Sequence, residues 1–286
     1  MPYNIPADHV RYDRLIDRIN ALAPAFSIHL GDTKSGGTPC TDALILRGKA
    51  HFDRFAGALF YTPGDNEWSD CHRPRAGRYD PLERLAFLRR TFFGAPRSLG
   101  RAPLPLERQA DVMPAFRLYV ENATWRHNNI RFATLHIVGG NNNFSHDPAA
   151  QAEYRARDEA NQAWIAEIAA RAQREGALGL VFAFQANLWT LFAPWTETGN
   201  GFARTRASLA TAAIAFARPV LLLHGDEHML IIDHPLRDPD GHVLRNVTRV
   251  QVMGAHQVHA VRVIVDPAAE SLFRFERLHV PENDAR

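Results

Sequence analysis

Three segments of this 286-residue chain each run from an apolar stretch, typical of a buried strand, directly into a Gly-Asp pair. They are FSIHLGDTKSG, ALFYTPGDNEW and VLLLHGDEHML, at residues 26–36, 58–68 and 220–230. In open α/β sheets, ligands bind beyond the carboxyl ends of the strands, where such residues gather. The pattern therefore predicts that Asp32, Asp65 and Asp226 converge in one site.

The third segment adds histidines to its aspartate. On an extended backbone alternate side chains share a face, so we expect His224, Asp226 and His228 to project together. Other histidines, such as His29 and His136, are expected in the core or on the surface rather than as ligands. The predicted site is therefore a cluster of carboxylate and imidazole groups.

Composition limits the classes of function. With 46% hydrophobic and 22% charged residues, the chain can bury a large core, and we expect one α/β domain over residues 1–286. The 33 basic and 31 acidic residues leave a net charge of +2, so no overall field favours nucleic acid. No apolar run approaches the roughly 20 residues of a membrane-spanning helix. A small-molecule partner is the expectation that remains.

Predicted helices and strands alternate along the chain, as in a sheet with helices packed on its faces. Asp147, an N-cap followed by Pro148, makes one helix clear. The segment 72–115, rich in Pro, Arg and Gly, is expected to cover the rim of the site. The predicted helices are 8–23, 41–56, 80–92, 147–174 and 202–217. The predicted strands are 25–31, 57–62, 116–121, 130–138, 178–184 and one from 220, with short β runs over 247–275.

The two cysteines follow the first two Gly-Asp pairs at similar distances, so Cys40 and Cys71 are expected on neighbouring loops. A disulfide between them would indicate an oxidising compartment. Two free buried thiols are an equal alternative, and the spacing fits no zinc motif. The N-terminus carries no secretory signal, which gives a cytoplasmic location by default.

The order of strand-GD, strand-GDNE, strand-Q and strand-HGDEH, over residues 26–266, resembles the calcineurin-like metallophosphoesterases. The motifs of that superfamily run Asp-x-His, Gly-Asp, Gly-Asn-His-Glu or -Asp, a lone His, and Gly-His-x-His. The resemblance implies an αββα fold, a layered β-sandwich flanked by helices. It also implies hydrolysis of a phosphomonoester or phosphodiester by a metal-activated water. One alternative is a non-catalytic member that binds a ligand or phosphate, and another is a single-metal hydrolase of a different ester.

The resemblance also assigns metal ligands. Asp32 stands where the family has the carboxylate that bridges two metals. Asp65, or Asn66 with a shift of one residue, stands at the amide ligand. Gln185 replaces the lone His, Asp226 replaces the first His of the last motif, and His228 matches its final His. These replacements make the second metal position rich in oxygen, which favours Mn²⁺ or Mg²⁺, with Ca²⁺ as a further option.

The expected catalytic groups are Asn66, His224 and His228. Asn66 stands at the position of the family's leaving-group acid, but a carboxamide cannot supply a proton at neutral pH. His224 is the nearest candidate for that proton. Asn141 and Asn142 are expected either to donate to a phosphate or to form an ordinary polar turn.

The family's first motif has no counterpart here, because the first predicted helix begins by residue 8. We expect that a late start removed a strand ending in Asp, and an upstream extension would leave export open. Without that strand, the first metal position keeps only Asp32 and His228. A two-metal site is then short of ligands.

Overall fold

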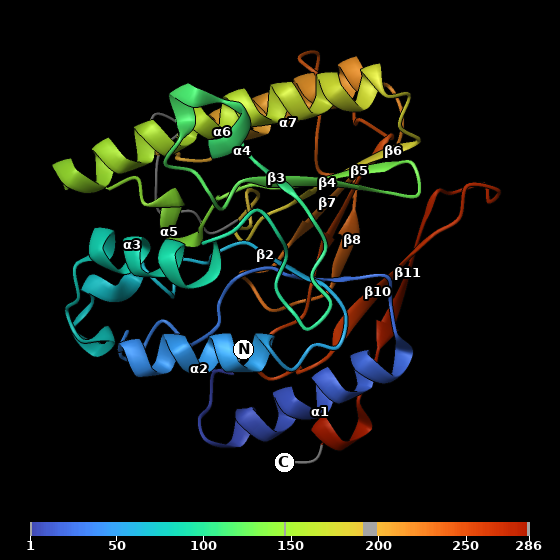
Figure 1. The fold of residues 1–286 in the computed structure, drawn as a ribbon. Coiled ribbons are helices and arrows are strands. Elements are labelled where there is room, and N and C mark those ends of the chain that lie inside the picture. The colour runs from blue at the N-terminus through green and yellow to red at the C-terminus, as the bar shows by residue number, and fades with distance from the viewer. Residues whose placement is uncertain (1, 146, 191–198, 285–286) are drawn as a thin grey trace.

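The computed structural model describes residues 2–145, 147–190 and 199–284. It is an α/β structure with one mixed seven-stranded sheet, two two-stranded sheets and surrounding helices (Figure 1). The general α/β class is therefore confirmed. The helices are α1 (Ala7–Leu22), α2 (Asp42–Phe52), α3 (Pro81–Phe92), α4 (Gln109–Val112), α5 (Gly139–Asn142), α6 (Pro148–Arg174) and α7 (Ala203–Phe216). The short 3₁₀ helices include η1 (Ser69–His72), η2 (Pro74–Ala76), η3 (Pro114–Phe116) and η5 (Pro281–Asn283).

The seven-stranded sheet has the order β3-β4-β5-β6-β7-β9-β8. Its central strands β5, β6, β7 and β9 pair in parallel, and the outer pairs are antiparallel. These strands are β3 (Glu107–Arg108), β4 (Ala123–His127), β5 (Ile130–Thr134), β6 (Gly179–Ala183), β7 (Val220–His224), β8 (Ile231–Asp233) and β9 (Val247–Gln251).

Two small sheets complete the β structure. β1 (Ser27–His29) pairs in parallel with β2 (Leu59–Tyr61), and β10 (Ala260–Val265) forms an antiparallel hairpin with β11 (Phe273–Leu278). Because β1 and β2 are parallel, the loops after them, which carry the first two Gly-Asp pairs, leave the same end of this sheet.

Alternating side chains divide the core on either side of the large sheet. Phe182 of β6 and Leu222 of β7 pack with α6 and α7, which cover one face (Figure 1). Val181 and Leu221, their neighbours in sequence, pack on the other face with residues of β2 and β11. A third cluster joins the outer side of β2 to α1, α2 and α3. The small sheets therefore lie between the large sheet and these three helices.

The segment 116–121, predicted as a strand, does not form one. Pro114 begins the 3₁₀ helix η3, and the chain turns before β4 begins at Ala123. Leu118 is 65% exposed and Tyr119 is buried, without the regular alternation of a strand along the segment. The prediction was wrong because local β propensity gives way to the turn that Pro114 initiates.

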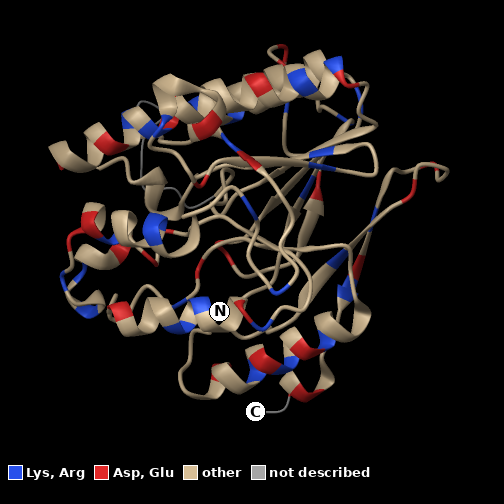
Figure 2. Ribbon diagram, viewed as in Figure 1, with Lys and Arg blue, Asp and Glu red and all other residues tan. Residues whose placement is uncertain are grey.

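The long helix was predicted correctly. Asp147 Oδ1 accepts a hydrogen bond of 2.8 Å from the Ala149 amide, and α6 ends at Arg174 as expected. Acidic and basic residues are interspersed along the outer helices (Figure 2). No helix among the described residues is long and apolar enough to cross a membrane.

Candidate metal centre

The three Gly-Asp loops meet at the side-chain amide of Gln185, which follows β6. Its Nε2 lies 3.3 Å from Asp32 Oδ2, 3.1 Å from Asp65 Oδ1 and 3.4 Å from Asp226 Oδ1. An amide nitrogen carries two hydrogens, so it cannot satisfy three carboxylates at full strength. The structure thus brings these three aspartates, predicted to converge, around one shared donor.

The backbone fixes which atom of Gln185 faces the carboxylates. The Gly139 amide donates a hydrogen bond of 2.6 Å to Gln185 Oε1, so the nitrogen end must point toward the aspartates. Gln185 was predicted as a metal ligand through its oxygen. In this structure it is a hydrogen-bond donor shared by the three carboxylates.

Sharp turns aim the aspartates into the site. Asp32 and Asp226 both have positive φ, 58° and 79°, as does Gly31 at 79°. A Cβ on Gly139 would lie 2.6 Å from Asp65 Oδ2 and 2.9 Å from Asp226 Oδ1. Only glycine at residue 139 lets the backbone approach both carboxylates this closely.

A second group of contacts centres on Tyr3, which the sequence analysis did not identify. Its hydroxyl donates to Asp32 Oδ2 at 2.7 Å and accepts from Asn66 Nδ2 at 2.9 Å. His228 Nε2 lies 3.1 Å from the same oxygen. With the hydroxyl hydrogen directed to Asp32, His228 is the donor in this contact and carries a proton on Nε2. Tyr3 thus connects Asp32, Asn66 and His228, three of the predicted site residues.

Glu67 forms hydrogen bonds with both the Asp32 loop and the Asp65 loop. It is fully buried, and its Oε1 accepts from the Thr33 amide at 3.1 Å, the Gly64 amide at 3.3 Å and the Tyr61 hydroxyl at 3.0 Å. Thr33 belongs to the Asp32 loop, whereas Gly64 precedes Asp65. Its position directly after Asp65 and Asn66 was a sequence signal, but no role was predicted from it.

Burial makes the negative charges of the site unfavourable. It raises the pKa of Asp32 to about 8, with Glu67 and Asp226 adding to the effect. It raises the pKa of Asp226 to about 6, and that of Asp65 well above its usual value. Burial beside Asp32 likewise raises the pKa of the Tyr3 hydroxyl, which is therefore neutral. The site as described holds more carboxylate than its surroundings stabilise.

One buried lysine lies beside this cluster. Lys34 Nζ donates to the backbone oxygens of Ser35 and Thr38, at 3.1 Å and 2.9 Å. Burial lowers its pKa, although the nearby carboxylates oppose the shift. These two hydrogen bonds go to neutral oxygens, and the charge of Lys34 attracts the carboxylates of the site through space.

The structure separates His224 from the two residues expected beside it. Its ring stacks on Phe184 with centroids 5.5 Å apart, and burial lowers its pKa to about 3. Strand β7 ends at His224, and the positive φ values of Asp226 and His228 break the alternation that the prediction assumed. His224 is neutral at pH 7 and does not line the cavity beside the aspartates.

The asparagines predicted to face a phosphate are used within the protein. Asn141 Nδ2 donates to the carbonyls of Phe144 and Gly199, and Asn142 Oδ1 accepts from Arg157 at 2.6 Å. Their positive φ values, 59° and 57°, belong to a tight turn. Of the two expectations for these residues, the polar turn describes their contacts.

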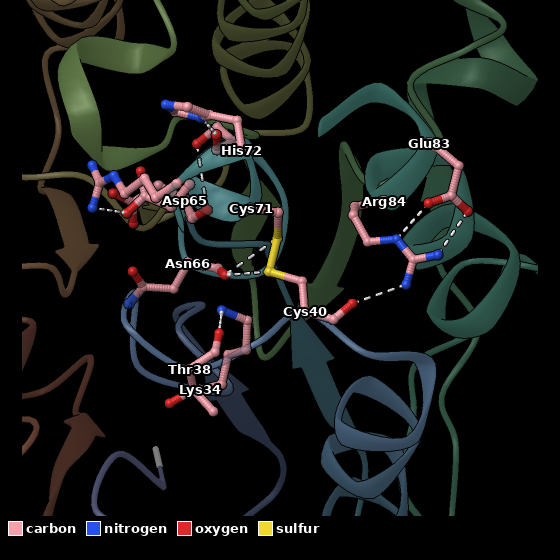
Figure 3. Close-up of a disulfide and its surroundings, with 12 residues drawn as sticks. Lys34, Thr38, Cys40, Asp65, Asn66, Cys71, His72, Glu83 and Arg84 are labelled. Atoms are coloured by element: carbon pink, nitrogen blue, oxygen red, sulfur yellow. Dashed lines mark hydrogen bonds and ion pairs between the residues drawn. A yellow bond between two sulfur atoms is a disulfide. The ribbon is translucent and has the colours of Figure 1, made fainter. Parts of the chain in front are cut away.

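Cys40 and Cys71 form a disulfide (Figure 3). Both cysteines are fully buried, and the Asn66 carbonyl lies close to their sulfur atoms. The bond joins the segment that follows Asp32 to the segment that follows Asp65. It therefore stabilises the arrangement of two of the three loops that build the site.

A cavity of about 170 Å³ opens beside the cluster. Its polar end includes Tyr3, Asp32, Asp226 and His228, and its apolar end follows β1. Two other groups of ligand-type side chains, His259 with His279 and Asp284, and Asp238 with Asp240 and His242, lie mostly exposed at the surface. The cavity singles out the aspartate cluster as the place where a ligand would meet buried polar groups.

Comparison with family models and with curated proteins finds no match for this chain. The functional argument therefore rests on the geometry of the site.

Proposed function

We propose that this protein is a metal-dependent phosphoester hydrolase of the metallophosphoesterase type. The observation that carries the proposal is the convergence of Asp32, Asp65 and Asp226 around Gln185 in a buried site. Buried carboxylates without a cation are costly, which supports a divalent ion as the ligand of this site. The placement of the small sheets between the large sheet and α1, α2 and α3 supports the expected αββα layering.

The oxygen-rich donors would hold Mn²⁺ or Mg²⁺, with Ca²⁺ a further option. Asp32, Asp65 and Asp226 would be the ligands, and Gln185 would orient them through its amide hydrogens. A bound divalent ion would supply an activated water and offset charge on the phosphate. His228 becomes a ligand through Nε2 only if that nitrogen gives up its hydrogen bond with Tyr3.

Tyr3, Asn66 and His228 would bind the substrate's phosphate from the open side of the site. Phosphate oxygens are acceptors, and Asn66 has a second amide hydrogen to donate to them. Tyr3 and His228 would have to release the hydrogen bonds that they now donate to Asp32 and to Tyr3. None of the three is a strong acid at neutral pH. We therefore infer a substrate whose leaving group departs with little protonation, such as an aryl phosphoester.

The alternative is a non-catalytic protein that binds phosphate. It is favoured by the hydrogen bonds through which Tyr3 already satisfies Asp32, Asn66 and His228, because such a network can be complete without a metal.

The test uses p-nitrophenyl phosphate, bis-p-nitrophenyl phosphate and p-nitrophenyl acetate, each with Mn²⁺, Mg²⁺ or Ca²⁺. We expect turnover of a phosphate ester and a rise in melting temperature with the active metal. Asp32→Asn should lower the rate of turnover by at least about tenfold. It should lower the metal affinity, measured from the rise in melting temperature, by a similar factor. The variant Glu159→Gln, at an exposed position of α6, is the control and should change neither.

Each other result rejects the hydrolase. Stabilisation by inorganic phosphate without turnover indicates the binding protein. Turnover of the acetate alone indicates a different esterase. If none of the three metals changes the rate or the melting temperature, the proposed metal centre is wrong.

A further inference from the structure

Strands β1 and β10 both line one mostly apolar cavity of about 430 Å³. The lining residues include Ile28 and Leu30, in and just after β1, and Val261, Val263 and Val265 of β10. Protein interiors are close-packed and rarely leave voids larger than a water molecule. A gap of this size between two strands needs a specific explanation.

The backbone of β1 offers hydrogen-bonding groups toward this gap. The Ser27 amide donates to the Ala58 carbonyl at 2.9 Å, and the His29 carbonyl accepts from Thr62 at 3.2 Å. Parallel pairing with β2 thus uses alternate residues, Ser27 and His29. The amide and carbonyl of Ile28, between them, face the opposite edge.

The same reasoning applies to β10. The Asp266 amide donates to the Leu272 carbonyl at 3.0 Å, which continues the β10–β11 ladder. Alternation along an antiparallel strand then turns the backbone groups of Val261, Val263 and Val265 away from β11. Two open strand edges therefore border one cavity, and an open edge is a template for pairing with another strand.

Side chains around the gap show what kind of strand fits. Leu221 and Leu223 of β7 line it from the large sheet, and Ile19 and Leu22 line it from α1. A strand with apolar neighbours on both faces has a continuous apolar sequence rather than an alternating apolar and polar one. The hydrophobic cluster here is also incompletely covered, since Phe26, Ile28, Leu30, Val261, Val263 and Val265 are only partly buried.

The gap has the length of a strand. β10 contains six residues, which at about 3.3 Å per residue span about 20 Å. The smaller cavity beside Asp32 shares Ile28, Leu30 and Val261 with the larger one, so the two cavities are neighbours.

We propose that the gap between β1 and β10 binds an extended, apolar polypeptide segment of five or six residues. The segment pairs with both strands and joins the two small sheets into one five-stranded sheet. An apolar small molecule would fill the volume but leave the backbone groups of Ile28 and Val263 without partners, which disfavours it. Recognition by strand addition takes its affinity from main-chain hydrogen bonds and its specificity from the side-chain pockets.

The probe is a synthetic peptide with six alternating Val and Ile residues between pairs of lysines. Its control has proline at the third and fifth of the six positions, which removes backbone donors. Hydrogen exchange of the full chain is measured with each peptide. We expect the Val-Ile peptide to slow exchange of the Ile28 and Val263 amides by at least about tenfold, and the proline peptide to leave them unchanged.

A protein variant distinguishes binding in the gap between β1 and β10 from nonspecific binding to the protein surface. Val263→Trp places a large ring in the gap and should weaken peptide binding by at least about tenfold. Ile232→Trp, at an exposed position of β8, is the matched control and should bind the peptide as the unmodified protein does. Melting curves establish that both variants fold.

Several outcomes overturn the proposal. If the two peptides bind equally well, or if the two variants bind the peptide equally well, the peptide does not pair with β1 and β10. Protection of Ile28 and Val263 by decanoate but not by the peptide assigns the cavity to an apolar small molecule. Protection that rises with protein concentration in the absence of peptide assigns it to a second copy of the chain.

Discussion

The 2.6 Å hydrogen bond from the Gly139 amide to Gln185 Oε1 determines which end of the Gln185 side chain faces the aspartates. The nitrogen end lies against Asp65 and Asp226, where an oxygen would add repulsion. A neutral donor therefore occupies the centre of the carboxylate cluster. A cation in the same region would do more, because it offsets full charges.

Gln185→Glu should convert this neutral donor into a fourth carboxylate. Without metal, we expect a loss of about 3 kcal/mol in the free energy of unfolding, since the new charge is buried and unpaired. Saturating Mn²⁺ should recover part of this loss. Urea unfolding with EDTA and with Mn²⁺ measures both effects. Gln257→Glu, at an exposed position, should be neutral, and an equal loss in both variants would contradict the account.

Gly139→Ala should disrupt the approach of the backbone to Asp65 and Asp226. The added methyl would lie 2.6 Å and 2.9 Å from their oxygens, so the carboxylates must move. We expect a cost of about 1 to 3 kcal/mol in unfolding free energy, together with loss of metal-dependent stabilisation. Gly94→Ala is the control, because its Cβ would meet only an ordinary contact at 3.5 Å. Calorimetry of both variants with and without Mn²⁺ makes the comparison.

Loss of the Cys40–Cys71 bond should loosen the first two loops. Replacing both cysteines by alanine is expected to lower the free energy of unfolding by about 2 to 4 kcal/mol, measured by urea unfolding. Thiol titration of the unfolded, unreduced protein should find no free thiol, and two after reduction. Two free thiols before reduction, in protein purified under oxidising conditions, would contradict the disulfide.

Glu121 predicts a pH dependence that does not involve the aspartate cluster. Burial opposes its charge, but Arg89 and the 2.8 Å hydrogen bond from His136 outweigh burial and hold the pKa of Glu121 well below its usual value of 4.5. Its contribution to stability is therefore present above pH 4.5 and is lost as the pH falls further.

The variant Glu121→Gln should accordingly lose about 3 kcal/mol at pH 7, and the difference from the unmodified protein should shrink below pH 4.5. The slope should approach 1.4 kcal/mol per pH unit, which is about the value for one proton. Urea unfolding between pH 3 and pH 7 measures it. A difference that stays constant with pH would show that charge is not involved, and the exposed Glu276→Gln provides the baseline.

Local sequence patterns predicted most of the elements that build the site. Asp147 and Pro148 identified the start of α6, and the apolar runs before Asp32, Asp65 and Asp226 contain β1, β2 and β7. They also predicted that these aspartates converge, because strand direction in an α/β sheet decides where the following loops lie. Where a rigid turn interrupts the backbone period, as at Pro114 and after His224, the same reasoning failed.

By itself, the sequence determined the α/β class and the strand ends that carry the aspartates. Only the tertiary structure decided which way Gln185 points, that Tyr3 meets Asp32, Asn66 and His228, and that His224 faces the core. The reason is physical: strand and helix periods act over a few residues and can be read along the chain. Contacts between residues 3 and 228, or 139 and 185, depend on how distant backbones approach one another, and no local period encodes that.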